Sequence, residues 1–146
     1  MEERKIVLDQ AIPEDYSMLR ITVFNNDILE IAVVKVSNTY CITKYIGYIK
    51  SDEIISENFH FNKITYKELE KAESLDTIMS KVLNIIGNDT IIYLNSDEQF
   101  ELLKSKCESL GIQINNIAID GAKLLNQIPR DIRGYVCNSL DILDLF

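Results

Sequence analysis

The sequence lacks the residues on which several familiar functional classes depend. It contains no tryptophan, two prolines, five glycines, three cysteines and a single histidine in 146 residues. Cys41, Cys107 and Cys137 are odd in number and far apart, which argues against a disulfide framework or a CxxC metal site and favours buried free thiols. His60 has no Cys or His neighbour that would complete a zinc site. The scattered glycines form neither a P-loop nor a GxGxxG turn, so no phosphate-binding loop is expected.

Long apolar runs and a targeting signal are also missing. The unbroken apolar runs are far shorter than the roughly 20 residues that a membrane-spanning helix needs. The N-terminus, MEERKIVLDQ, lacks the basic and then apolar plan of a signal peptide. We therefore expect a cytoplasmic protein with no membrane partner.

Basic residues are fewer than acidic residues. The chain has 15 basic and 23 acidic residues, and its formal net charge of -8 opposes attraction to the phosphates of nucleic acids. Apolar residues make up 47% and charged residues 26%, which is a globular rather than a disordered composition. The length suits one domain, which we place at 1–146 with 1–13 as a leader segment.

Three extended segments follow the leader. Residues 17–24, 27–36 and 39–49 are rich in Ile, Val, Thr and Tyr, which are typical of strands. A turn dipeptide fills each gap, and the first is Asn25-Asn26. Because asparagine tolerates positive φ, it suits the two-residue turns of hairpins. The pattern predicts an antiparallel three-strand meander.

The middle segment, 27–36, is apolar on both alternating faces. Such a strand is expected to lie centrally in a sheet that helices cover on both sides. The predicted faces are Ile28, Ala32, Val34 and Val36 on one side, and Leu29, Ile31 and Val33 on the other. Asp27 and Glu30 are three residues apart, so a strand sends them to opposite faces and they cannot act as a pair. We expect Glu30 near a strand edge or under a helix.

Helices and strands alternate in the second half of the chain. The predicted elements are helices over 74–87 and 96–111, strands over 90–94 and 112–120, and helices over 121–128 and 138–146. Ser96 and Gln99 are spaced as a capping box, in which each side chain bonds the backbone N–H of the other residue. The predicted fold class is α/β. Its mixed five-stranded sheet combines the antiparallel meander with two parallel strands, has helices on both faces, and follows the order βββαβαβαα.

Several segments carry a family resemblance. They are PEDYSMLRITVF and DILEIAVVKV in the meander, IIYLNSDEQFELLKSKCESLG and IAIDGAKLLNQI in the alternating half, and NSLDILDLF at the end. Together with the order of elements, they resemble the DEDD family of 3′–5′ exonucleases, the type found as polymerase proofreading subunits. The similarity runs from about residue 13 to the C-terminus and implies a ribonuclease-H-like fold.

The family's chemistry needs four carboxylates around two divalent cations, Mg²⁺ or Mn²⁺. The resemblance places the first Asp of its D-x-E motif at Asn25, with the Glu deleted. The second motif, HNxxFD, aligns with 94–99, so that Asn95 and Gln99 are degenerate motif positions and Gln99 stands at the Asp position. The third motif is expected beyond Phe146 and is therefore absent. The resemblance thus implies a degenerate, truncated exonuclease domain with no catalytic residues, no metal ligands and no cofactor.

Two further features are expected to be structural or to bind a partner. Asp120 matches a family residue whose role is to organise the strand-to-helix turn. The last predicted helix is amphipathic, and its apolar residues offer an interface to a protein partner or to a second copy of the chain. They are Leu140, Leu143, Leu145 and Phe146. Packing of these residues in the core of one chain is the alternative.

The sequence leaves three functional hypotheses. The first is a catalytically inactive exonuclease-like domain that acts as a binding or interaction module, with nucleic acid as a weaker partner than protein. The second is a metal-dependent 3′–5′ exonuclease or nucleic-acid-binding subunit, completed by a partner or by Asp97, Asp120 or Asp141 with Mg²⁺ or Mn²⁺. The third is an acidic mimic of nucleic acid that blocks a DNA- or RNA-binding protein.

Overall fold

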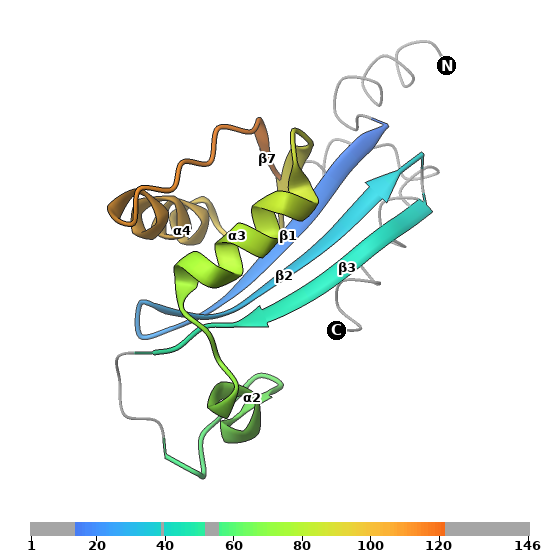
Figure 1. Ribbon diagram of the computed structural model, residues 1–146. Coiled ribbons are helices and arrows are strands. Elements are labelled where there is room, and N and C mark those ends of the chain that lie inside the picture. The colour runs from blue at the N-terminus through green and yellow to red at the C-terminus, as the bar shows by residue number, and fades with distance from the viewer. Residues whose placement is uncertain (1–13, 39, 52–55, 122–146) are drawn as a thin grey trace.

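The computed structural model describes residues 14–38, 40–51 and 56–121, whose centre is a five-stranded mixed sheet (Figure 1). Its strands are β1 Asp15–Phe24, β2 Asp27–Ser37, β3 Tyr40–Tyr48, β6 Thr90–Tyr93 and β7 Ala118–Asp120, in the spatial order β3-β2-β1-β6-β7. The pairs β1–β2 and β2–β3 are antiparallel, whereas β1–β6 and β6–β7 are parallel. The predicted α/β class and sheet plan are confirmed, and they are consistent with a ribonuclease-H-like fold.

The turn between β1 and β2 is the tight reversal that the two asparagines predict. Asn25 and Asn26 have φ values of 49° and 64°, and Phe24 pairs directly with Asp27 across the turn. Two consecutive residues with positive φ define the hairpin turn whose twist matches that of the strands. Asn38, at the next reversal, also has a positive φ of 51°.

A β-bulge changes the predicted faces of β2. Thr22 pairs with Glu30 but Val23 pairs with Ile28, so that Leu29 is the extra residue on β2. The bulge reverses the alternation between Leu29 and the turn. Ile28 therefore belongs to the core cluster under the helices, and the prediction that it faces the other way was wrong.

Two helices cover one face of the sheet. They are α3 Leu75–Ile86 and α4 Asp97–Ser109, and Figure 1 shows α3 crossing in front of the strands with α4 beside it. Their buried side chains share a core with β1, β2 and β6; on the helices these are Ile78, Met79, Val82, Ile86, Phe100, Leu103 and Cys107. Burying each large side chain contributes roughly 1.5–3 kcal/mol, which explains why these short helices dock on the sheet. Burial also raises the pKa of the Cys107 thiol to about 11, whereas Cys41 is exposed, contrary to expectation.

The opposite face of the sheet is buried as well, as the apolar pattern of β2 predicts. Met18, Ala32, Val34 and Ile92 are each at most 2% exposed. The helices predicted over 121–128 and 138–146 lie outside the described residues, as do the leader and Cys137. So do the predicted interface residues Leu140, Leu143, Leu145 and Phe146. Within the described ranges, no helix is long and apolar enough to cross a membrane.

Sequence patterns missed a small unit between β3 and α3. A two-stranded sheet, β4 His60–Phe61 and β5 Ile64–Thr65, leads into the short helix α2 Tyr66–Glu70. Thr65 and Glu68 form a capping box at the start of α2, and the hydroxyl of Thr65 lowers the pKa of the Glu68 carboxyl. These strands are too short to show a period of two.

The strand predicted over 112–120 was also too long, because only β7 Ala118–Asp120 pairs with β6. The reason lies in the side chain of Asn116. Its amide donates to the carbonyls of Gly87 and Asp89, at 3.0 and 2.8 Å, and so ties the segment to the loop after α3.

Candidate functional site

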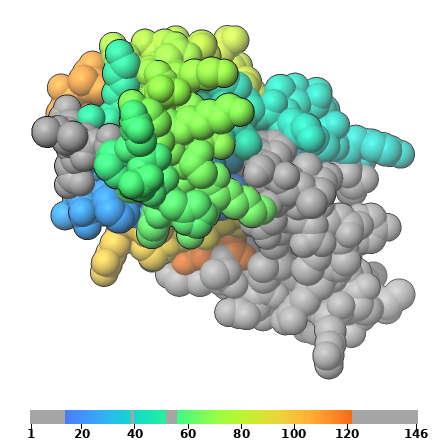
Figure 2. Space-filling model, turned by 90° about the horizontal axis from the view of Figure 1, so that it is seen from below, coloured from blue at the N-terminus to red at the C-terminus, as the bar shows by residue number. Residues whose placement is uncertain are grey.

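A hollow of about 600 Å³ lies at the carboxyl end of β1. β1 contributes residues 20–23, β2 contributes Glu30, and the β4–β5 hairpin contributes 61–64. The segment that leads from β6 into α4 adds Leu94, Asn95 and Gln99. Figure 2 shows this end of the molecule, with the green segment that includes α2 at the front and the blue residues of β1 beside it. In open α/β sheets, ligands bind preferentially beyond the carboxyl ends of the strands.

Asn95 holds this end of β1 to the start of α4. Its Oδ1 accepts from the N–H of Ile21 and its Nδ2 donates to the C=O of Ile21, both at 2.8 Å. The Nδ2 also donates to Oε1 of Gln99 at 2.8 Å. The side chain thus continues the ladder of β1 and β6 beyond Tyr93, where strand pairing stops. The structure therefore brings together Asn95 and Gln99, two of the three predicted motif positions.

The third predicted position, Asn25, does not line the hollow. It lies in the exposed hairpin turn. The capping box predicted for α4 is only half formed. The backbone N–H of Gln99 donates to Oγ of Ser96 at 3.2 Å, but the Gln99 side chain accepts from Asn95 and does not return to Ser96.

Arg20, Thr22 and Glu30 form the floor of the hollow on the sheet, and sequence reasoning did not single out the first two. Arg20 and Thr22 are two residues apart on β1, so their side chains share one face. The Thr22 hydroxyl donates to Oε1 of Glu30 at 3.1 Å, and Nη2 of Arg20 lies 3.6 Å from the same oxygen. Glu30 is 6% exposed, so its side chain is buried on a face of the sheet and does not lie at an exposed strand edge. Burial of this carboxylate requires such partners.

The donors that line the hollow do not fit a two-metal centre. Among the described residues that line the hollow, Glu30 is the one acid, and Thr22 and Arg20 already engage it. In the described part of the chain, no group of three or more His, Cys, Asp or Glu side chains could hold a metal ion. Two-metal hydrolysis requires several carboxylates around the ions.

The other acids considered as replacements lie away from the hollow. Asp97 accepts a hydrogen bond of 2.5 Å from the hydroxyl of Tyr93, and this bond raises the pKa of Tyr93 to about 12. Asp120 pairs with Tyr93 in the register of β7 and β6 and is half-buried. Neither acid lines the hollow, and Asp141 is outside the described residues. The role predicted for Asp120 at the turn into 121–128 involves undescribed residues and stays a prediction.

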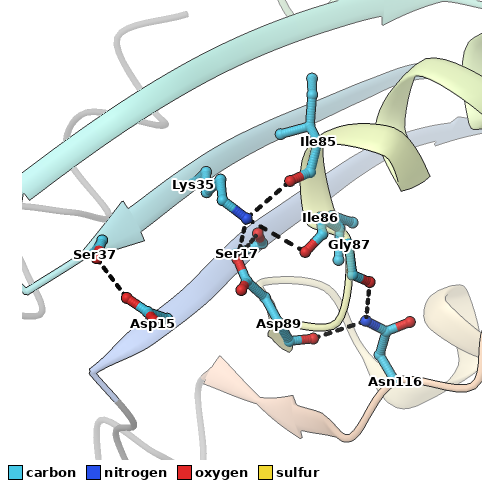
Figure 3. Close-up of polar contacts among 9 residues, drawn as sticks. All are labelled: Asp15, Ser17, Lys35, Ser37, Ile85, Ile86, Gly87, Asp89 and Asn116. Carbon is cyan, nitrogen blue, oxygen red and sulfur yellow. Dashed lines mark hydrogen bonds and ion pairs between the residues drawn. The ribbon is translucent and has the colours of Figure 1, made fainter.

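A second polar cluster lies near the start of β1, under the end of α3 (Figure 3). Nζ of Lys35 donates to Oδ2 of Asp89 at 2.8 Å and to the carbonyl oxygens of Ile85 and Ile86 at 3.0 and 3.4 Å. Oγ of Ser17 donates to the same oxygen of Asp89 at 3.0 Å. The ammonium thus satisfies carbonyls at the carboxyl end of α3 and complements the helix dipole there. This cluster closes the carboxyl end of α3.

Comparison with known proteins shows a distant similarity to a DNA polymerase. No family model matches the chain. A DNA polymerase III of the PolC type from Caldanaerobacter subterraneus subsp. tengcongensis is 21% identical over 117 residues. The match covers 80% of this chain but 8% of the polymerase. This similarity to a region of a polymerase is compatible with an exonuclease-like domain.

Proposed function

We propose that the chain is an exonuclease-like domain without two-metal nuclease chemistry, which acts as a binding module. The supporting observation is the composition of the hollow. Around it, the positions that we assign below to the family's catalytic acids carry a guanidinium, a hydroxyl and an amide, from Arg20, Thr22 and Gln99.

The hydrogen bonds of Asn95 indicate which residues stand at the D-x-E positions. Gln99 aligns with the Asp of the second motif, and Asn95 joins it to Ile21 on β1. The acids of a D-x-E motif are two residues apart and share one face of the strand. The pair on β1 that flanks Ile21 with this spacing is Arg20 and Thr22. We therefore infer that the motif maps onto residues 20–22 and not onto Asn25.

This placement reverses the charge of the site. Two unit charges about 4 Å apart near a protein surface interact with about 4 kcal/mol, so a guanidinium beside a divalent cation is strongly unfavourable. Thr22 and Gln99 supply no compensating negative charge. Glu30 is close to Arg20 and accepts from Thr22, so its carboxylate already serves an internal ion pair.

A nuclease assay tests the proposal. The full chain is incubated with 3′-labelled single-stranded DNA in Mg²⁺ and then in Mn²⁺, with an active DEDD exonuclease as the positive control. We expect the label to remain intact in both metals. Trimming of the 3′ end that depends on the metal and is abolished by EDTA would contradict the proposal.

The partner of a silent domain is expected to be another protein or a second copy of the chain. Sedimentation of the purified chain separates these two cases, since a stable dimer sediments as a single heavier species. The hollow at the end of β1 is the candidate binding site within the described residues.

A further inference from the structure

Resting on the proposed function, we propose that the hollow binds a peptide carboxylate, at the C-terminus of a partner chain that ends in an apolar residue, through Arg20, Lys63 and Gln99 and without a metal ion.

The charges around the hollow favour a ligand with one negative charge. Among the described residues that line it, Arg20 and Lys63 are basic and Glu30 is the one acid. The Arg20 side chain is 25% exposed, whereas that of Glu30 is 8% exposed. A planar guanidinium carries five N–H donors, so it can hold Glu30 and a second carboxylate together.

Gln99 supplies a neutral donor from a second element. Its Oε1 accepts from Nδ2 of Asn95, which fixes the orientation of the amide and leaves its NH₂ group as the one that can serve a ligand. Asn95 itself is bound to both polar groups of the Ile21 backbone, so the amide pair is held rigidly. Lys63, in the exposed turn between β4 and β5, adds a third donor from the opposite wall.

Part of the wall of the hollow is apolar, although Asn62 also lines it. Val23 on β1, Phe61 on β4 and Ile64 on β5 line it together with Leu94. Phe61 is held in place by Phe24, whose ring centroid lies 5.1 Å away. The volume of about 600 Å³ lies within the roughly 300–1,000 Å³ of typical ligand sites. Such walls suit the side chain of an apolar terminal residue, while the donors face its carboxylate.

A carboxylate fits the site better than a phosphate group or a nucleic acid. Glu30 next to Arg20 repels a dianion more strongly than a monoanion. The N-terminus of α4, a usual donor group for phosphates, is occupied by Ser96 and carries Asp97 and Glu98 in its first turn. The net charge of -8 further opposes a polyanionic strand.

The test follows the side-chain amide signals of Asn95 and Gln99 by NMR, in the ¹⁵N-labelled full chain with EDTA present. The probe is an N-acetylated tripeptide that ends in leucine with a free carboxylate. The matched probe is the same peptide as its C-terminal amide. We expect the acid to shift the signals of Asn95 and Gln99 in a saturable way and the amide to leave them unchanged.

Variants assign the donors. Because one charge-assisted hydrogen bond changes affinity by about tenfold, we expect Lys63→Gln to weaken binding of the acid peptide by up to that factor. The double variant Arg20→Gln with Glu30→Gln removes the guanidinium without leaving a buried charge unpaired, and it should lose saturable binding. Lys104→Gln removes the same charge from α4, outside the hollow, and should leave binding unchanged. Lys63 and Lys104 are chosen so that the comparison holds even if the double variant does not fold.

The outcomes are decisive in each direction. Equal shifts with the acid and the amide, or no shift with either, would overturn the proposal. So would tighter binding of a short oligothymidine at the same signals, which would assign the hollow to nucleic acid. Because all titrations contain EDTA, none of these results depends on the absence of nuclease activity. Failure of the carboxylate proposal therefore leaves the proposed function standing, whereas metal-dependent trimming of DNA contradicts the proposed function.

Discussion

Two polar clusters, one near each end of β1, contain similar residues but have different roles. Near the start of the strand, Lys35, Asp89 and Ser17 bond to one another and to carbonyls of α3, so the cluster closes on itself. Toward the carboxyl end, Arg20 and Glu30 pair beside a hollow that two amide side chains border. Charged groups that bond to the end of a helix stabilise the fold, whereas charged groups that line a cavity form a candidate binding site. The difference becomes visible only when the hydrogen-bond partners are known.

The largest effect on stability is expected from removing the side-chain amide of Asn95, which lies near the carboxyl end of β1. Asn95→Ala leaves the N–H and C=O of Ile21 without their partners and removes the contact with Gln99. Each lost bond to a half-buried group costs roughly 1 kcal/mol, so the free energy of unfolding should fall by about 3 kcal/mol in urea titrations. Asn84→Ala, on the exposed side of α3, is the control and should change it by less than about 0.5 kcal/mol. Equal losses in the two variants would contradict the structural role of Asn95.

A smaller loss of stability is expected from disrupting the cluster of Lys35, Asp89 and Ser17. Lys35→Met removes the ammonium partner of the Asp89 carboxylate, whose side chain is 13% exposed. It also removes the hydrogen-bond donor of the Ile85 and Ile86 carbonyls. We expect the free energy of unfolding to fall by about 2 kcal/mol.

Lys81→Met is the matched control for that change. Its ion pair with Glu73 is exposed, with side chains 49% and 45% accessible. Such surface pairs contribute at most about 1 kcal/mol, so urea unfolding should show a clearly smaller loss than for Lys35→Met. If the two lysine variants unfold alike, the cluster at the end of α3 is not the stabilising feature described above.

Sequence patterns predicted the elements that depend on local residues. The Asn25-Asn26 turn and the apolar positions of α3 follow from positive φ and from helical periodicity, both of which act over a few residues. The polar site could not be found in the same way. Arg20 and Glu30 become neighbours only through the antiparallel register, and the bulge at Leu29 that sets this register has no sequence signature of its own.

Gln99 illustrates how a correct local pattern can mislead. Its spacing from Ser96 predicts a capping box, and its backbone does bond to Ser96. The side chain of Gln99, however, accepts from the amide of Asn95. That amide is held in place by Ile21 on β1, which lies 74 residues away from Asn95 in the sequence. Only the spacing of two between Arg20 and Thr22 could have pointed to this part of β1 from the sequence.

The smallest predicted effect concerns pH. The hydrogen bond to Asp97 raises the pKa of Tyr93 from 10.0 to about 12 in the folded chain. Because the folded pKa lies above the unfolded one, the contribution to stability is complete below pH 10 and is lost as the pH rises toward 12. We expect Asp97→Asn to lower the pKa of the Tyr93 phenol. The titration of Tyr93 is obtained by subtracting the phenolate absorbance of a Tyr93→Phe variant from that of the same chain with Tyr93 present, with and without Asp97→Asn. An unchanged titration in Asp97→Asn would show that the bond does not control Tyr93.

Binding of Mn²⁺, measured by calorimetry, tests the central claim most directly, because it asks whether the residues at the end of β1 exclude metal ions. The natural chain is compared with the variant Arg20→Asp, Thr22→Glu, Gln99→Asp, which puts acids at the inferred motif positions. A variant with Asn25→Asp and Gln99→Asp is the control for the alternative position in the hairpin turn. We predict saturable binding by the triple variant alone. Binding of two Mn²⁺ ions by the natural chain, or equally tight binding by the Asn25→Asp control, would contradict the account.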